Sequence, residues 1–200
     1  MTTHRKKTVI LFPTLVEAHP FMNRCPSTAE VRICGMGITA CAACTAATLT
    51  DRRPDMIVLA GVAGAYTDSG LHKGDCVMIE REYLADMGTM RGGRFVPLPV
   101  AGDTATGNYY DNPTPLPAIL PAIHSDTVSV AGTPLRAPRL GTSAENMEGA
   151  GFFAICEALG ARYAQIRAIS NHVGEERRLW TIDTAAEHLA DAIEKLLAAI

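Results

Sequence analysis

Two polar side chains of this sequence lie where a strand or a helix is expected to begin or end, and both could meet a ligand there. Glu148 falls in the opening turn of an apolar, small-residue helix, and Asn171 closes the run Arg167-Ala-Ile-Ser-Asn171. The two oxygens of a carboxylate suit a pair of vicinal hydroxyls such as those of a ribose, although a carboxylate at this point can also serve the helix dipole alone. Asn171 can likewise contact a ligand or only hydrogen-bond the backbone at the strand end.

Two glycine-rich segments follow expected strands and let a ligand approach the main chain closely. Gly35-Met-Gly37-Ile-Thr-Ala40 matches a relaxed dinucleotide fingerprint between a strand and a helix. A nicotinamide site also needs an acid at the tip of the next strand, but residues 56–60 run into Gly61-Val-Ala-Gly64 without a carboxylate. We therefore expect no nicotinamide cofactor. The second segment either exposes backbone N–H groups to a ligand or only makes a tight strand exit.

The elements that must position these residues alternate between strands and helices. Short apolar runs predict strands, and small or apolar residues at three-to-four spacing predict helices. The expected strands cover residues 8–12, 31–34, 56–60, 76–79, 95–96, 127–131 and 163–169, and the expected helices cover 15–22, 39–49, 147–159 and 184–200. Thr39 is the expected N-cap of the second helix, and Thr184-Ala-Ala-Glu187 has the form of a capping box that opens the last one.

This alternation predicts one α/β domain over residues 1–200, with a substantially parallel sheet covered on both faces. Ligands of such sheets bind beyond the carboxyl ends of the strands, which here means segments 13–17, 35–37, 61–64 and 170–171. Residues 97–121 contain six prolines and two glycines, so we expect a long loop or lid there.

Composition and charge exclude several classes of protein. The 200 residues carry a formal net charge of −3, and 48% are hydrophobic, which is enough for a sizeable core. No run of about 18 apolar residues is present, so we expect no membrane span or signal sequence and a cytoplasmic protein. Basic residues are scattered, which argues against a nucleic-acid partner. Among six cysteines only Cys41 and Cys44 have ligand-like spacing, and we expect no metal.

Taken in order, these segments resemble the nucleoside phosphorylase and nucleosidase superfamily along most of the chain. Within it the sequence is most similar to futalosine hydrolases, on account of Asn146-Met-Glu-Gly-Ala150, Ile169-Ser-Asn-His-Val173 and Trp180. The resemblance implies a single-domain, three-layer nucleoside-phosphorylase-like α/β fold with a mostly parallel, mixed central sheet flanked by helices. The other matching pieces are residues 7–17, Gly35-Met-Gly37 with its Ala-rich helix, residues 54–64, Gly74-Asp75 and Arg167-Ala-Ile-Ser-Asn171.

The resemblance also implies a role for each matching residue. Glu17 corresponds to the acid that positions and deprotonates the attacking water, Glu148 to the carboxylate that holds the ribose hydroxyls, and Met147 to its neighbour in the sugar pocket. Asn171 stands where the adenine-releasing enzymes have an acid, and Val62 where they commonly have serine. The further expected substrate contacts are Ala63, Gly64, Ser170, Phe152, Trp180 and Arg177.

These roles predict that water cleaves a purine N-glycosidic bond. The transition state carries positive charge on the sugar and negative charge on the leaving base, and Glu17 and Glu148 place negative charge around the sugar. Asn171 can hydrogen-bond the base but cannot act as a general acid, which favours a 6-oxopurine over adenine. Residues 12–17 include no arginine that could bind phosphate, so we expect hydrolysis rather than phosphorolysis.

The expected activity is hydrolysis of futalosine to hypoxanthine and dehypoxanthine futalosine, in menaquinone biosynthesis and without a cofactor. The alternatives are a nucleosidase for 5'-methylthioadenosine, S-adenosylhomocysteine or aminodeoxyfutalosine, and a non-catalytic nucleoside-binding module. A homo-oligomer, a dimer or larger, is implied by the resemblance. The benzoate on the 5' side of futalosine needs an apolar wall, from Trp180, Phe152 or Phe153, and a cation, from Arg177, Arg178, Arg91 or Arg94.

Overall fold

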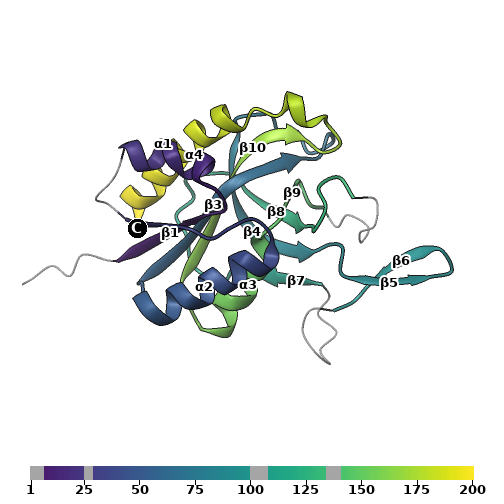
Figure 1. Ribbon diagram of the computed structural model, residues 1–200, viewed down its shortest axis with the longest axis horizontal. Coiled ribbons are helices and arrows are strands. Elements are labelled where there is room, and N and C mark those ends of the chain that lie inside the picture. The colour runs from purple at the N-terminus through teal and green to yellow at the C-terminus, as the bar shows by residue number, and fades with distance from the viewer. Residues whose placement is uncertain (1–6, 25–28, 100–107, 134–140) are drawn as a thin grey trace, which may run out of the picture.

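Strands and helices alternate along the chain and build a layered α/β fold (Figure 1). The computed structural model describes residues 7–24, 29–99, 108–133 and 141–200. In this part of the chain the elements are β1 (Thr8–Phe12), α1 (Leu15–Arg24), β2 (Glu30–Ile33), α2 (Ile38–Arg52), β3 (Met56–Ala65), β4 (Cys76–Leu84), β5 (Gly88–Arg91), β6 (Arg94–Pro97), β7 (Tyr109–Asp111), β8 (Ala122–Thr127), β9 (Ala144–Asn146), α3 (Gly149–Ala158), β10 (Tyr163–His172) and α4 (Ile182–Ala199), with a 3-10 turn at Arg177–Leu179 before α4.

The main sheet is mixed and mostly parallel, as expected. Its order is β10-β4-β8-β9-β3-β1-β2, with β7 paired to β4. β10 also pairs with β3, so that strands β3, β9, β8, β4 and β10 close into a ring. The pairs that involve β1, together with β10–β3, β4–β8 and β8–β9, are parallel. The carboxyl ends of β1, β3 and β10 therefore point the same way, which is where the site lies.

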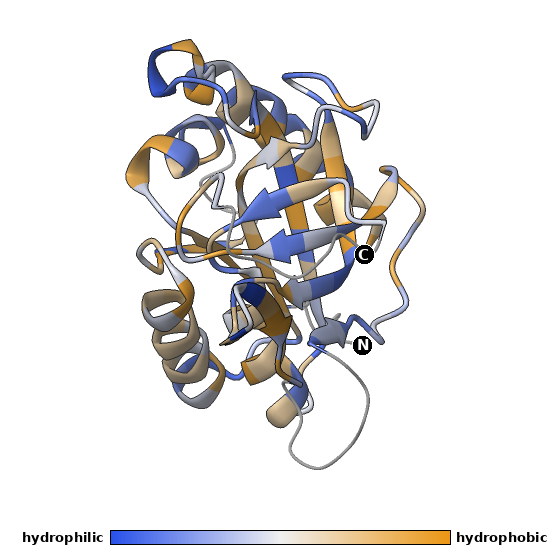
Figure 2. Cartoon of the chain, turned by 90° about the vertical axis from the view of Figure 1, so that its right-hand side faces the viewer, coloured by the Kyte–Doolittle hydropathy of each residue, from blue (hydrophilic) through white to orange (hydrophobic). Residues whose placement is uncertain are grey.

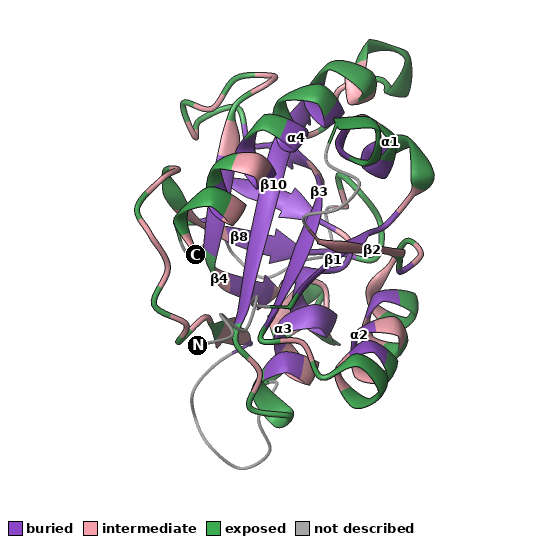
Figure 3. Ribbon diagram, turned by 90° about the vertical axis from the view of Figure 1, so that its left-hand side faces the viewer, coloured by how far each residue is buried: buried purple, intermediate pink, exposed green. Residues whose placement is uncertain are grey.

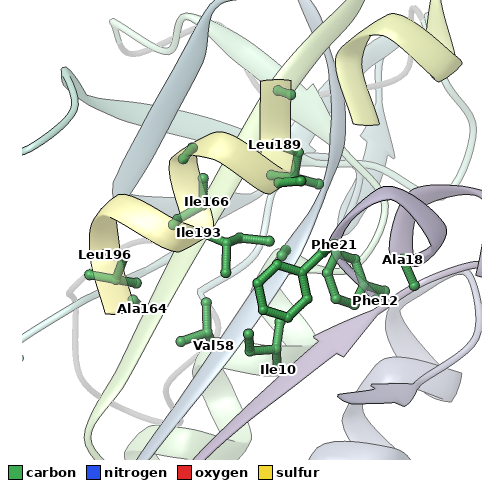
Figure 4. Close-up of a cluster of buried hydrophobic side chains, with 14 of the residues drawn as sticks. Ile10, Phe12, Ala18, Phe21, Val58, Ala164, Ile166, Leu189, Ile193 and Leu196 are labelled. Atoms are coloured by element: carbon green, nitrogen blue, oxygen red, sulfur yellow. The ribbon is translucent and has the colours of Figure 1, made fainter. Parts of the chain in front are cut away.

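Two pairs of helices cover the sheet on opposite faces, α1 with α4 and α2 with α3 (Figure 3). Each pair packs against the sheet around its own hydrophobic core. On the first face the stripe Leu189, Ile193 and Leu196 of α4 packs with Phe21 of α1 over Ile10 of β1 (Figure 4). Full burial of each such side chain stabilises the fold by about 1.5–3 kcal/mol. The three-layer α/β class expected from the sequence is confirmed.

β3 and β10 are longer than expected, and the glycines of residues 61–64 lie within β3. These residues do not form a strand exit, because Gly61 pairs with Arg167 and Gly64 with Asn171 in the parallel register between β3 and β10. A Cβ at Gly61 would lie 2.6 Å from Nη1 of Arg167, and one at Gly64 would lie 3.0 Å from Nδ2 of Asn171. The glycines therefore make room for two polar side chains of the neighbouring strand.

Both helix N-termini expected from capping residues begin earlier than the sequence suggested. α2 begins at Ile38 with Gly37 as its N-cap, not Thr39, because Gly37 takes the positive φ of 88° that turns the chain into the helix. α4 begins at Ile182 with Thr181 as its N-cap, so the expected capping box does not form. Glu187 instead pairs with Arg24 of α1.

The strand expected at residues 127–131 lies upstream, as β8 (Ala122–Thr127). A search for apolar runs does not find this strand, because several of its residues are polar. Ser125, Asp126 and Thr127 are nevertheless all buried, since each has a side-chain hydrogen-bond partner. β9 was not expected. Within the segment predicted as a loop or lid, residues 109–111 form β7, and residues 100–107 lie outside the described part of the chain.

A hairpin of β5 and β6 projects from the body of the fold (Figure 1). It includes the short strand expected at residues 95–96, and Arg91 and Arg94 pair at its end. In the described segments we find no helix long and apolar enough to cross a membrane.

Candidate active site

A cavity of about 290 Å³ opens beyond the carboxyl ends of β1, β3 and β10. Figure 2 shows hydrophilic residues at the arrowheads of strands near the middle of the view. The cavity brings together Glu17, Glu148 and Asn171, which are far apart in the sequence. Of the other expected contacts, the cavity is lined by Met147, Val62, Ala63, Gly64, Ser170, Trp180 and Arg177.

Phe152 is the exception among the expected contacts. Its side chain is fully buried in the core between α2, α3 and the sheet, where it packs edge-on against Tyr163 at 5.7 Å between ring centroids. Phe153 lies in the same cluster. The expectation that this pair supplies the apolar wall of the site is wrong, because α3 turns both rings toward the core and presents only its N-terminus to the cavity.

Glu17 lies in the first turn of α1 with its carboxylate held at the cavity wall. Thr14 Oγ1 donates to Oε2 at 2.6 Å, and the Val62 N–H donates to Oε1 at 2.9 Å. Burial raises the pKa of Glu17 above its usual range, against the lowering effect of these bonds and of Arg167. Each carboxylate oxygen keeps a further acceptor site, so the group can bind water and accept a proton from it.

Glu148 is the N-cap residue of α3, and its carboxylate accepts hydrogen bonds from the start of α2 and from β10. The Gly37 N–H donates to Oε1 at 3.0 Å, and Arg167 Nη1 donates to Oε2 at 3.1 Å. The helix expected over residues 147–159 begins two residues later, at Gly149, so Glu148 precedes its first turn. As the N-cap it reaches out of the helix and into the cavity.

Arg167 is the only positive group among the residues that hold the two carboxylates, and it is fully buried. Besides Glu148 it binds the Val62 carbonyl through Nη1 at 3.2 Å and Asn146 Oδ1 through Nη2 at 2.9 Å. A buried arginine that binds carboxylate and carbonyl oxygens at once fixes them relative to each other. It also offsets part of the charge that two nearby carboxylates would otherwise concentrate.

Asn171 lies within β10 and lines the same cavity. Its Oδ1 accepts from Ser170 Oγ at 2.8 Å, and its Nδ2 donates to the His172 carbonyl at 3.0 Å. An amide nitrogen carries two hydrogens, so Nδ2 retains a donor for a ligand. Glu145 of β9 pairs with Gly64, as Asn171 does from β10, and its buried carboxylate also lines the cavity.

Trp180 and Arg177 form the outer part of the cavity lining. The Arg177 guanidinium stacks on the indole at 4.4 Å from the ring centroid, and the indole N–H donates to the Glu175 carbonyl at 3.0 Å. The pair offers a flat apolar surface beside a cation. Arg178 pairs with Glu176 at the surface, and neither it nor the hairpin arginines 91 and 94 are among the residues that line this cavity.

Sequence reasoning missed three polar residues of the site: Arg167 as a binding group, Asn146 and Glu145. A signal for Arg167 was present, because an arginine inside the apolar strand 163–169 must find buried acceptors. Glu145 and Asn146 belong to a strand of three residues, which is too short to produce a recognisable pattern.

The fold and the cavity together define the class of protein. Residues 118–200 match the model of the phosphorylase superfamily. A solved futalosine hydrolase mutant from Helicobacter pylori superposes with a TM-score of 0.79 at 14% identity, over 98% of this chain and all of that one. The 5'-methylthioadenosine nucleosidase of Arabidopsis thaliana superposes with a TM-score of 0.76 at 15% identity, over 96% and 95% of the two chains. The chain thus shares the fold of these two nucleoside-cleaving enzymes.

A relative in sequence narrows the assignment. The futalosine hydrolase of Acidothermus cellulolyticus is 34% identical over 189 residues, which cover 86% of this chain and 77% of that protein. The chain belongs to the futalosine hydrolase family, whose members hydrolyse an N-glycosyl bond.

Proposed function

We propose that this protein hydrolyses futalosine to hypoxanthine and dehypoxanthine futalosine. The observation that supports this most is that one cavity brings together the buried carboxylates of Glu17 and Glu148 and the uncharged amide of Asn171. The carboxylates suit the cationic sugar of the transition state, and the amide suits a 6-oxopurine. The product would serve menaquinone biosynthesis in the cytoplasm, and the reaction needs no cofactor.

Glu17 acts as the general base in this proposal. It holds a water molecule against the sugar carbon and accepts its proton while the glycosidic bond breaks. The raised pKa of Glu17 makes it a stronger base than an exposed glutamate, and its hydrogen bonds from Thr14 and Val62 keep the carboxylate aimed. Glu148 accepts from the ribose hydroxyls, with Met147 beside the sugar.

Asn171 holds the departing base in this proposal. Negative charge on a leaving 6-oxopurine spreads onto O6, where the amide N–H can donate, and the amide carbonyl can accept from a protonated N7. Val62, Ala63, Gly64 and Ser170 line the same cavity.

Trp180 and Arg177 suit the 5' part of futalosine. A benzoate presents an aromatic face and a carboxylate, and the stacked pair offers an indole face and a guanidinium at the rim of the cavity. We therefore propose Arg177 as the cation rather than Arg178, Arg91 or Arg94, because only Arg177 of these four lines the cavity.

A homo-oligomer is the expected assembly. A projecting two-stranded hairpin is marginally stable by itself. Met90, at 53% exposed, and the half-buried Phe95 belong to the hairpin of β5 and β6, which a second copy of the chain would cover.

The decisive assay is incubation of the protein with futalosine, with and without phosphate, followed by chromatography of the released base and sugar. Hypoxanthine released at the same rate in both reactions supports the proposal. Strict dependence on phosphate, with a sugar phosphate as product, contradicts it, as does the absence of any released base.

Asn171→Asp should shift base preference toward 6-aminopurines. A protonated aspartic acid can donate to N7 of adenine, which the amide cannot do as an acid. We expect the ratio of kcat/KM for aminodeoxyfutalosine over futalosine to rise by about tenfold or more. Asn171→Ala is the matched control and should lower both rates. An unchanged ratio in the Asp variant would mean that this side chain does not face the base.

A further inference from the structure

Glu82 of β4 is a fully buried carboxylate to which the reaction proposed above assigns no part. Its Oε1 accepts two hydrogen bonds, from Asn146 Nδ2 at 2.7 Å and from Thr127 Oγ1 at 2.7 Å. Its Oε2 accepts from Gln165 Nε2 at 3.1 Å. A Cβ at Gly149 would lie 2.4 Å from this carboxylate, so the N-terminus of α3 packs directly on it.

The two donors to Oε1 are themselves the acceptors that satisfy the start of α3. Asn146 Oδ1 accepts from the Glu148 N–H at 3.0 Å and from the Gly149 N–H at 2.7 Å. Thr127 Oγ1 accepts from the Ala150 N–H at 2.8 Å. Three N–H groups at the helix N-terminus, which have no partner within the helix, are thus bound by two side chains that share one carboxylate oxygen.

The orientation of the Asn146 side-chain amide, with Nδ2 toward Glu82 and Oδ1 toward Arg167, matters most for the site. With Nδ2 bound to Glu82, its Oδ1 faces Arg167 Nη2 and the backbone N–H of Glu148. If the amide were turned over, its NH₂ group would face these donors, which cannot accept a hydrogen bond. With the acceptor oxygen Oε1 of Glu82 behind it, the Asn146 amide has all its partners satisfied in one orientation alone. The hydroxyl of Thr127 is oriented in the same way, because its single proton goes to Glu82.

We propose that Glu82 is a positioning residue, which acts through Asn146 to fix Arg167 and the N-terminus of α3 and thereby holds the Glu148 carboxylate in the cavity. The inference rests on the proposed function only in that Glu148 meets the ribose. It assigns Glu82 no contact with substrate, because the fully buried carboxylate lies behind Asn146, which itself lines the cavity.

The acceptor oxygen, rather than the charge, carries this role. Burial raises the pKa of Glu82 to about 7 despite its hydrogen bonds and the nearby Arg167, so the charge is held only weakly near neutral pH. A glutamine keeps one acceptor oxygen for Asn146 and Thr127. Its NH₂ group can donate to Gln165 Oε1, which is buried without a hydrogen-bond partner among the described residues, once that amide turns over.

Glu82→Gln and Glu82→Met therefore form the critical pair. Misplacement of a binding group by about 1 Å can reduce the rate about 100-fold. We expect kcat/KM for futalosine to fall between about 10- and 100-fold in Glu82→Met and less than about threefold in Glu82→Gln. Thr45→Val is the matched control, because it removes a buried hydroxyl of α2 that donates to the Cys41 carbonyl and contacts none of these residues; it should change kcat/KM by less than about threefold.

The 2'-deoxy analogue of futalosine separates positioning from a general loss of structure. In the wild type, removal of the 2'-hydroxyl should weaken kcat/KM because Glu148 loses a donor. In Glu82→Met, removal of the 2'-hydroxyl should lower kcat/KM by a factor at least about tenfold smaller than in the wild type, since Glu148 is already displaced. An equal penalty in the two proteins, or equal damage by the Gln and Met variants, would overturn the proposal.

Amide hydrogen exchange tests the role of Glu82 without any turnover, so its result does not depend on whether the proposed reaction occurs. Exchange of the Gly149 and Ala150 amide hydrogens should be slow in the wild type and in Glu82→Gln and at least about tenfold faster in Glu82→Met. Unchanged protection in Glu82→Met would contradict the role of Glu82. A wild type that releases no base but shows this exchange pattern would contradict the proposed reaction alone.

Discussion

Replacement of Glu17 with Gln is expected to lower kcat for release of the base about 1,000-fold while KM changes by less than about threefold. Gln keeps an oxygen for the Val62 N–H, and the Thr14 hydroxyl can turn to accept from its NH₂ group, so the first turn of α1 should keep its shape. Only the ability to take a proton from water is lost. The change should therefore affect the transition state far more than the bound substrate.

Trp180 gives a direct measurement of binding for this variant. It is the single tryptophan of the chain and lines the cavity, so its fluorescence should respond to futalosine in the wild type and in Glu17→Gln with similar affinity. Glu187→Gln, on the exposed face of α4, is the control for an isosteric change that leaves the cavity intact. A rate within tenfold of the wild type in Glu17→Gln would show that another group acts as the base.

Replacement of Arg167 with Met should be the most damaging change to stability. The variant leaves the Glu148 carboxylate, the Val62 carbonyl and Asn146 Oδ1 without their shared donor inside the protein. Loss of one member of a buried ion pair costs about 3–5 kcal/mol, which is a large part of the stability of a typical domain. We expect this loss in the free energy of unfolding, measured by urea denaturation, together with loss of turnover.

Arg167→Lys is the informative companion variant. It restores the positive charge but not the planar fork that reaches Glu148 and Asn146 together, so it should recover part of the stability and little of the rate. If Arg167→Met lost less than about 1 kcal/mol, the network around the guanidinium would contribute far less than its contacts indicate.

The hydrophobic pattern predicted those elements that bury a continuous apolar face. The strand at residues 8–12 and the helix that carries Leu189 and Ile193 were expected nearly where they lie, because burial of apolar side chains selects their period. β8 and β9 escaped prediction because their buried side chains are polar. A polar residue is buried only when its partner is present, and partners such as Glu82 and Asn146 are 64 positions apart.

The sequence by itself determined the candidate residues of the site, since the family motifs identify Glu17, Glu148 and Asn171 one at a time. Tertiary structure alone decided that these three share one cavity and that Phe152 does not line it. It also revealed the buried Arg167 and Glu82 that hold the carboxylates in place. The physical reason is that apolar burial depends on local periodicity, whereas the pairing of buried charges depends on which strands the fold brings into contact.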